Sequence, residues 1–236
     1  MSSQRLVVVV DPGVRVYGHL HMAGETAPLL LLFHGNGELA ADYTRLAGLL
    51  TQVGFSLFVV DYRGYGMSEG DPSTSHLLGD AVTIFDALPE LVANHDSRPK
   101  QIFVMGRSLG SAAACELAFL RGREMAGLII ESGFASTRPL LALAGVPLAN
   151  YQELRDGHGN GMKIARFSGP TLILHGQDDT LILPDQARTL YLLSEAPIKR
   201  LVIIPNAGHN NLMSAGYADY SQALQWLLNA QSTTRL

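Results

Sequence analysis

The chain alternates short apolar runs with longer segments of helical periodicity, and this alternation restricts the fold more than any other feature. The runs are "PLLLLFHG", "FSLFVVDY", "QIFVMG", "GLIIES", "PTLILHG" and "RLVIIPNAG", and they are mostly apolar at successive positions. Strands of a parallel sheet have this pattern because helices bury both of their faces. Helices are predicted between these runs at residues 39–53, 75–93, 109–121, 184–193 and 215–228. This order predicts a doubly wound α/β sheet.

Two further strand candidates, "RLVVVVD" and "RVYGHLHM", precede this repeating part of the chain. The turn residues Asp11-Pro12-Gly13 separate them, which favours an antiparallel hairpin and brings the expected sheet to eight strands. Since no repeat or linker interrupts the pattern, we expect one domain over residues 1–236. The weakly periodic segment 132–168 is the exception, and we interpret it as a short lid, a small or absent cap.

Composition excludes several classes of protein. Apolar residues make up 47% of the 236 residues, the formal net charge is −4, and there is no basic block, so a nucleic-acid partner is not expected. The single cysteine, Cys115, excludes an internal disulfide and suits a reducing compartment. The longest apolar runs have the length of strands, and the amino-terminal run is too short for a signal peptide. We therefore expect no membrane span and a cytoplasmic protein.

The pattern Gly-x-Ser-x-Gly, which often holds a nucleophilic serine, occurs twice, at Ser68 and at Ser108. A nucleophile elbow requires a strand that ends directly before the serine and a helix that begins directly after it. Ser108 follows "IFVMGR" and precedes "LGSAAACELAFL", so it meets both requirements. Ser68 is separated from its strand by "RGYG", and Asp71-Pro72 follows it, which disfavours a helix. Ser108 is the candidate nucleophile and Ser68 a turn residue.

A serine nucleophile requires a histidine base and a carboxylate that orients the histidine. Of the three histidines after Ser108, His158 lies in an irregular stretch and His175 lies within the last turn of a strand. His209 follows the last strand in "IIPNAGHNN", a loop that can reach the carboxyl edge of the sheet. His209 is therefore the candidate base.

Three carboxylates are candidates for the acid. Asp178 and Asp179 follow the strand "PTLILHG", and because adjacent side chains point in different directions, only one of them is expected to reach His209. Glu131, at the end of "GLIIES", is the third candidate, since some hydrolases carry the acid on that strand.

The intermediate of acyl transfer carries an oxyanion, which backbone N–H groups must stabilise. One donor should be Leu109, directly after the nucleophile, and the other should lie in the loop "FHGNGE". Gly35 and Gly37 allow this loop to turn toward the serine, which makes Asn36 the second candidate. His34 is interpreted as a residue that braces the loop.

Taken together, the segments "HGNG", "DYRGYGMSEG", "GRSLG", "ESGFAS", "HGQDD" and "AGHNN" resemble the α/β-hydrolase family in content and order. The most similar subgroup comprises small serine hydrolases such as the BEM46-like proteins and protein depalmitoylases. In that family the last residue of His-Gly-x-x-Asp is the acid, and here this residue is Asp179. The resemblance also assigns Ser108 as the nucleophile and His209 as the base. It explains the second Gly-x-Ser-x-Gly as a feature of a family loop.

The expected activity is that of a serine hydrolase that cleaves esters or thioesters without a metal ion or cofactor. Apolar residues of the lid-like segment can line an acyl pocket or can pack a helix on the core, and both alternatives stay open here. They are Phe134, Leu140, Leu141, Leu143, Val146, Leu148 and Tyr151. An acyltransferase, an amidase or peptidase with the same triad, and a non-catalytic binding protein on this scaffold are the alternatives.

Overall fold

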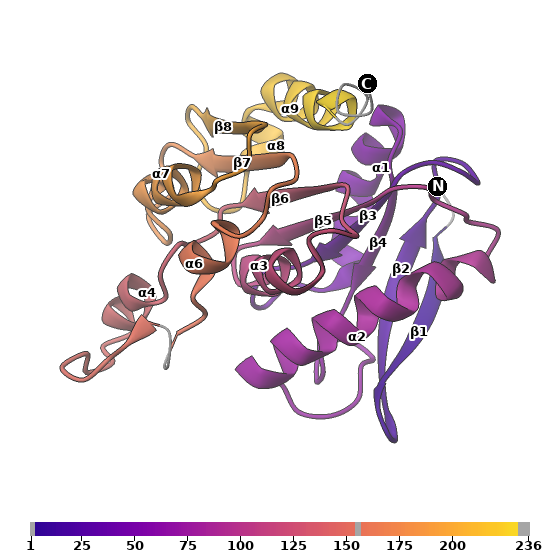
Figure 1. Ribbon diagram of the computed structural model, residues 1–236, viewed down its shortest axis with the longest axis horizontal. Coiled ribbons are helices and arrows are strands. Elements are labelled where there is room, and N and C mark those ends of the chain that lie inside the picture. Colours follow the sequence, from indigo (N-terminus) through magenta and orange to yellow (C-terminus); the bar gives the residue numbers. More distant parts are fainter. Residues whose placement is uncertain (1–2, 154–156, 231–236) are drawn as a thin grey trace.

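The computed structural model describes residues 3–153 and 157–230, and its centre is one eight-stranded sheet (Figure 1). The strand order is β1-β2-β4-β3-β5-β6-β7-β8. Only β2 runs antiparallel to its neighbours β1 and β4, and all other pairs are parallel. The strands are β1 (Gln4–Asp11), β2 (Val14–His21), β3 (Leu29–Phe33), β4 (Ser56–Val60), β5 (Ile102–Arg107), β6 (Gly127–Glu131), β7 (Thr171–Gly176) and β8 (Lys199–Ile204).

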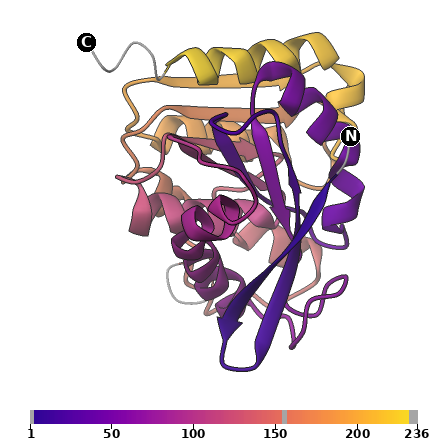
Figure 2. The same cartoon turned by 90° about the vertical axis from the view of Figure 1, so that its right-hand side faces the viewer.

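Helices cover both faces of the sheet, as Figures 1 and 2 show from two directions. Helices α2 (Thr74–Ala93), α3 (Gly110–Arg121) and α7 (Pro184–Leu193) cover one face, with the short α6 (Asn160–Ile164) beside α3. Helices α1 (Thr44–Val53) and α9 (Tyr217–Ala230) cover the other face and contact each other. The remaining elements are the 3-10 helix η1 (Ala40–Tyr43), α4 (Arg138–Leu143) and α8 (Leu212–Ala215).

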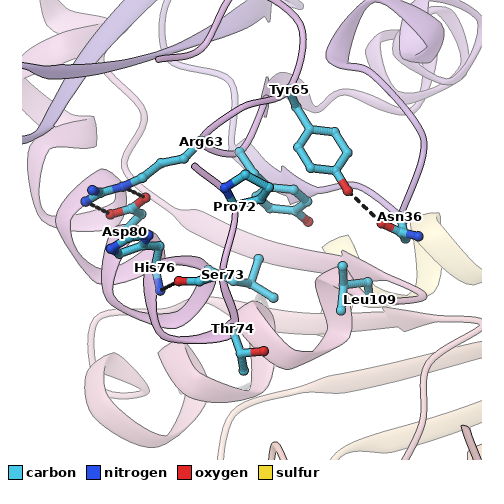
Figure 3. Close-up of a pocket in the computed structure, with 11 residues that line it drawn as sticks. Asn36, Arg63, Tyr65, Pro72, Ser73, Thr74, His76, Asp80 and Leu109 are labelled. Atoms are coloured by element: carbon cyan, nitrogen blue, oxygen red, sulfur yellow. Dashed lines mark hydrogen bonds and ion pairs between the residues drawn. The ribbon is translucent and has the colours of Figure 1, made fainter. Parts of the chain in front are cut away.

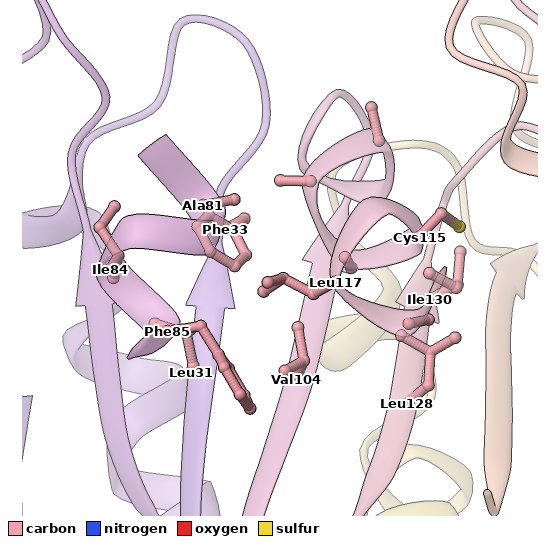
Figure 4. Close-up of a cluster of buried hydrophobic side chains, with 14 of the residues drawn as sticks. Leu31, Phe33, Ala81, Ile84, Phe85, Val104, Cys115, Leu117, Leu128 and Ile130 are labelled. Atoms are coloured by element: carbon pink, nitrogen blue, oxygen red, sulfur yellow. The ribbon is translucent and has the colours of Figure 1, made fainter. Parts of the chain in front are cut away.

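The central strands are apolar throughout because each face of the sheet has its own core. In β3, Leu31 and Phe33 belong to the core under α2 and α3, whereas Leu30 and Leu32 belong to the core under α1 and α9. Figure 4 shows the first of these cores, with Leu31 and Phe33 near side chains of α2 and α3. Burial of both faces therefore stabilises each strand through two layers of apolar contacts.

The sequence-based expectation of a doubly wound, mostly parallel sheet is confirmed. Every expected strand is present, and β1 and β2 form the expected antiparallel hairpin. The segment predicted as one helix at 39–53 begins as the 3-10 turn η1 before α1 continues it. The last helix lies at Tyr217–Ala230 rather than at 215–228 because Gly216 separates it from the short α8. No helix in the described part of the chain has the length and apolarity to cross a bilayer.

The lid-like segment 132–168 contains the short helices α4 and α6, and α4 projects away from the sheet (Figure 1). The apolar residues of this segment were expected either to pack on the core or to line a pocket, and the outcome differs from position to position. Phe134 is 1% exposed and is part of the core under α3, so it packs the core. Leu140 is partly buried against that core, whereas Leu143 is 67% exposed. Helix α4 has no fully buried residue.

One carboxylate, Glu153, connects the two ends of this segment. It accepts hydrogen bonds from Ser136 Oγ at 2.7 Å, Tyr151 OH at 2.6 Å and the backbone N–H of Thr137 at 3.0 Å. The backbone N–H of Gly159 also donates to it at 3.3 Å. Burial by itself would raise the pKa of Glu153, but these hydrogen bonds outweigh it and lower the pKa from 4.5 to about 2.

We expect these contacts to stabilise the fold in a pH-dependent way. A carboxyl with a lowered pKa contributes stability above its unfolded-state pKa and loses this contribution as the pH falls through about 4.5 toward about 2. Glu153→Gln should therefore reduce the free energy of unfolding near neutral pH, and its deficit relative to wild type should shrink on acidification. Urea unfolding at several pH values measures this. Glu195→Gln, at an exposed position, is the control and should show no such trend. A pH-independent deficit would contradict the assignment.

Candidate active site

Ser108 lies at a sharp turn between β5 and α3, where its backbone adopts a left-handed conformation with φ of +51°. Such a φ is uncommon for a residue other than glycine and is a form of strain typical of functional sites. Two glycines allow the strand and helix to approach this closely. A Cβ atom at Gly106 would overlap the carbonyl oxygen of Gly110, and one at Gly110 would overlap the carbonyl oxygen of Phe33. The side chain of Ser108 is thereby held at the carboxyl edge of the sheet.

The structure brings Ser108, His209 and Asp179 into one line of hydrogen bonds. Ser108 Oγ lies 3.0 Å from His209 Nε2, and His209 Nδ1 lies 2.7 Å from Asp179 Oδ2. An ionised carboxylate only accepts hydrogen bonds, so Nδ1 carries the imidazole proton and Nε2 is the acceptor for the serine hydroxyl. This is the arrangement in which an imidazole can remove a hydroxyl proton.

Asp179 is 2% exposed and is fixed by more than one neighbour. The backbone N–H groups of Leu181 and Ile182 donate to Oδ1 at 3.0 and 2.9 Å. His175 Nε2 lies 3.2 Å from Oδ2 and makes its hydrogen bond to the carbonyl oxygen of Ile182 at 2.6 Å, so a second imidazole packs beside the same carboxylate. Burial by itself would raise the pKa of Asp179, but the neighbouring His175 and His209 and the backbone N–H of Ile182 outweigh it and lower the pKa. The carboxylate therefore stays ionised beside His209.

The two candidate oxyanion donors face the same cavity, which has a volume of about 270 Å³ (Figure 3). The backbone N–H groups of Asn36 and Leu109 have no hydrogen-bond acceptor within residues 3–153 and 157–230. The neighbouring N–H of Gly35 is already used, because it donates to Glu38 Oε2 at 2.7 Å. The side chain of Asn36 is held by Tyr65 OH at 2.6 Å. Two unused donors at one end of a cavity can stabilise an oxyanion.

The cavity has polar groups at both of its ends, and at one end Leu109 lies near the Asn36 side chain that Tyr65 holds. Figure 3 shows Asn36 and Leu109 at one end and the ion pair between Arg63 and Asp80 at the other, with its two hydrogen bonds of 2.7 Å. The lining residues are Asn36, Tyr62, Arg63, Tyr65, Pro72, Ser73, Thr74, His76, Leu77, Asp80 and Leu109. The amino-terminal turn of α2 and the loop after β4 thus form its walls.

The other serine and histidine candidates have structural contacts. Ser68 Oγ accepts a hydrogen bond from the backbone N–H of Tyr17 at 3.0 Å and donates to the carbonyl of Asp61 at 3.1 Å, as a turn residue does. His158 lies 2.9 Å from Thr137 Oγ1, within the lid-like segment. His34 Nδ1 lies 2.8 Å from the carbonyl oxygen of Gly35, where it braces the loop.

Of the other two acid candidates, neither contacts His209. Asp178 is exposed on the loop after β7. Glu131 lies at the end of β6, where Arg107 Nε donates to it at 3.2 Å and Tyr220 OH donates to its other oxygen. Burial raises the pKa of Glu131, against the opposing effect of Arg107. In this structure Glu131 is bound to Arg107 and Tyr220, and Asp179 is the carboxylate that contacts His209.

Arg107 is a residue that the sequence reasoning missed. It occupies the variable position directly before Ser108, and its guanidinium also contacts the loop that carries His209. The only sequence signal was a charged residue at the end of an otherwise apolar strand. Among the described residues, no group of three or more His, Cys, Asp and Glu side chains is arranged to hold a metal ion.

The lid-like segment forms a second, smaller cavity of about 150 Å³ with the loop after β7. Leu140 and Leu143 contribute to it from α4, opposite Leu181 and Leu183. Leu141 and Tyr151 are partly exposed and are not among its lining residues. Of the candidate pocket residues, Leu140 and Leu143 alone contribute to this cavity.

Comparison with known proteins identifies the family. The family model Hydrolase_4, described as "Serine aminopeptidase, S33", matches residues 24–156. The uncharacterized protein Rv2307c of Mycobacterium tuberculosis is 32% identical over 212 residues, which cover 89% of this chain and 73% of that protein. Alpha/beta hydrolase domain-containing protein 17B of Xenopus laevis is 28% identical over 200 residues, covering 83% of this chain and 64% of that protein.

Solved structures share the fold. Est1E from Butyrivibrio proteoclasticus with bound ferulic acid has a TM-score of 0.77 at 19% identity, covering 97% of this chain and 99% of that chain. The sheet with its helices on both faces and the elbow at Ser108 define an α/β-hydrolase fold. The chain belongs to the α/β-hydrolase family, as the motif resemblance predicted.

The close approach at the elbow gives a prediction for stability. Gly110→Ala should lower the free energy of unfolding by about 1–3 kcal/mol or more, because the new methyl group overlaps a backbone carbonyl. Gly79→Ala, in the exposed interior of α2 with no atom near the new Cβ, should instead raise it by about 0.5–1 kcal/mol. Urea unfolding of both variants measures the difference. Equal stability of the two variants would contradict a packed elbow.

Proposed function

We propose that the protein is a serine hydrolase that cleaves carboxylic esters or thioesters through an acyl-enzyme. The observation that carries the proposal is the line of hydrogen bonds from Ser108 Oγ through His209 to Asp179, of 3.0 and 2.7 Å. His209 Nε2 removes the hydroxyl proton as Ser108 Oγ attacks the carbonyl carbon of the substrate. Asp179 holds the tautomer and stabilises the imidazolium that forms.

The backbone N–H groups of Asn36 and Leu109 stabilise the oxyanion of the tetrahedral intermediate. Collapse of this intermediate breaks the bond to the leaving group, which takes the proton from His209. Water then attacks the acyl-enzyme, with His209 again as the base, and releases the acid and free Ser108. The cycle requires no metal ion or cofactor.

We assign the acyl group of the substrate to the cavity beside Leu109. Its volume of about 270 Å³ exceeds the roughly 150 Å³ of a cavity that binds benzene, so a group of medium size can enter it. The solved structures with a similar fold include Est1E with ferulic acid bound, the Pyrococcus furiosus esterase Pf2001 and a monoacylglycerol lipase, which supports ester substrates. A small-molecule ester or thioester is therefore the proposed substrate class.

Amide or peptide cleavage is the second candidate because the matching family model is described as a serine aminopeptidase. The same three residues support this reaction, as they would support acyl transfer to another acceptor, since the triad does not fix the substrate. A non-catalytic binding protein would show neither turnover nor covalent labelling. The assay should therefore include an aminoacyl p-nitroanilide beside the esters.

Removal of the nucleophile tests the proposal directly. Ser108→Ala should lower kcat for p-nitrophenyl butyrate on the order of 10⁴-fold or more and abolish covalent labelling by a fluorophosphonate. Ser68→Ala, which alters the second Gly-x-Ser-x-Gly, should keep both within about threefold, because this serine lies in a turn. Ester turnover that survives Ser108→Ala would contradict the proposed function.

The cavity assignment predicts a dependence on acyl length. Thr74→Trp adds bulk at the cavity wall, so we expect kcat/KM for p-nitrophenyl hexanoate to fall about tenfold or more while acetate changes little. Glu90→Trp lies at an exposed position of the same helix outside the lining, and this control should leave both esters unchanged. Equal losses for the two esters with Thr74→Trp would exclude this cavity as the acyl site.

A further inference from the structure

Arg107 is a buried cation directly before the candidate nucleophile, with 7% of its surface exposed. It lies at the end of β5, in register with Glu131 on β6. All three guanidinium nitrogens make polar contacts, and these lead to three different segments of the carboxyl edge. Arg107 touches no reacting atom of the proposed reaction, so its contacts require another explanation.

The first contact leads to the loop with the candidate oxyanion donor. Arg107 Nη1 forms an ion pair with Glu38 Oε1. The other oxygen of Glu38 accepts hydrogen bonds from the backbone N–H of Gly35 at 2.7 Å and from Tyr43 OH at 2.6 Å. This carboxylate therefore fixes the turn of the loop at Gly35, and the next N–H along the chain is that of Asn36.

The second contact leads to the loop with the candidate base. Arg107 Nη2 donates to the backbone carbonyl of His209 at 2.9 Å and to Asn210 Oδ1 at 2.8 Å. A hydrogen bond to the carbonyl of His209 fixes the backbone from which the imidazole extends. One guanidinium group thus holds the backbone of the base and, through Glu38, the backbone beside the oxyanion site.

The third contact connects Arg107 with the sheet and the helix behind it. Nε donates to Glu131 at the end of β6, and Glu131 also accepts the hydroxyl of Tyr220 from α9. Burial lowers the pKa of Arg107, but Glu131 and Glu38 outweigh burial and raise it, so the guanidinium stays charged. Because these contacts fix the end of β5, the guanidinium makes its other two contacts from a rigid position.

We propose that Arg107 is a positioning residue. It keeps the loop that carries Asn36 (the oxyanion loop) and the loop that carries His209 (the base loop) in the correct position relative to Ser108. This inference rests on the proposed function and assigns to it a residue outside the triad. Arginine suits the role because its planar group donates in several fixed directions, whereas a lysine ammonium is a point charge on a flexible stem. A displacement of about 1 Å of a catalytic group can lower the rate about 10²-fold, so such a residue should affect kcat.

The test compares Arg107→Lys with wild type in steady-state hydrolysis of p-nitrophenyl butyrate. We expect kcat to fall about 10²-fold with KM within about threefold, because the acyl cavity does not include Arg107 while the transition-state contacts do depend on it. Arg121→Lys is the matched control. Arg121 forms a similar two-bond contact, to Asp86 at 2.8 Å, at the far end of α3, and this variant should keep kcat. Thermal unfolding of each variant shows whether it is folded at the assay temperature.

Two further measurements separate positioning from a loss of structure. Arg107→Ala should regain part of its kcat, about fivefold or more, on addition of millimolar methylguanidinium, whereas methylammonium should have no effect. Asn210→Ala removes one acceptor of the Arg107 guanidinium from an exposed loop position. It should lower kcat about three- to tenfold without a change in thermal stability. This variant therefore tests the positioning role even if the Arg107 variants do not fold.

The outcomes distinguish this inference from the proposed function. Absence of ester turnover and of labelling at Ser108 in the wild type would overturn the proposed function itself. An active wild type with Arg107→Lys and Asn210→Ala both within twofold in kcat would overturn only the positioning role. A rise in KM at constant kcat would also overturn it, since that result would place Arg107 in substrate binding.

Discussion

The close contact between the start of α3 and the end of β3 is the constraint on which the site depends. The Gly110 backbone lies so near the carbonyl of Phe33 that no side chain fits between them. This approach forces the turn at Ser108 into a left-handed conformation and directs the hydroxyl toward the edge of the sheet. It also brings the start of α3 beside the loop after β3, which is where Asn36 and Leu109 face one cavity. A looser packing of strand and helix would separate the hydroxyl from both donors.

Polar groups at this edge form two sets that share the loop after β8. One set is the line Ser108, His209 and Asp179, in which backbone N–H groups hold the carboxylate and His175 packs beside it. The other set is centred on Arg107, which is bound to two carboxylates behind the site. Buried charges are stable only when they are paired and hydrogen-bonded, and each charge here has such partners. The base loop is thus held through the imidazole of His209 on one side and through its carbonyl on the other.

The walls of the cavity explain why the sequence contains two similar serine patterns. The loop after β4 carries Tyr65 and the first turn of α2 carries Thr74, and both line the cavity beside Leu109. Ser68 lies within that loop and satisfies backbone groups of Tyr17 and Asp61. The glycines around Ser68, Gly66 and Gly70, adopt positive φ in this turn, whereas the glycines around Ser108 permit close packing. The same Gly-x-Ser-x-Gly motif thus has two different structural roles in this chain.

The sequence alone determined the sheet, its hairpin and the elbow, because continuous apolar runs, turn residues and a strand–serine–helix order are local patterns. It also indicated His209 and, through family resemblance, Asp179. The contacts of Glu131 were decided only by the tertiary structure, since Arg107 and Tyr220 come from distant parts of the chain. The role of Phe134 was decided in the same way, because burial against the core depends on how the segment folds back. Local patterns specify elements, whereas contacts between distant residues depend on the packing of the whole domain.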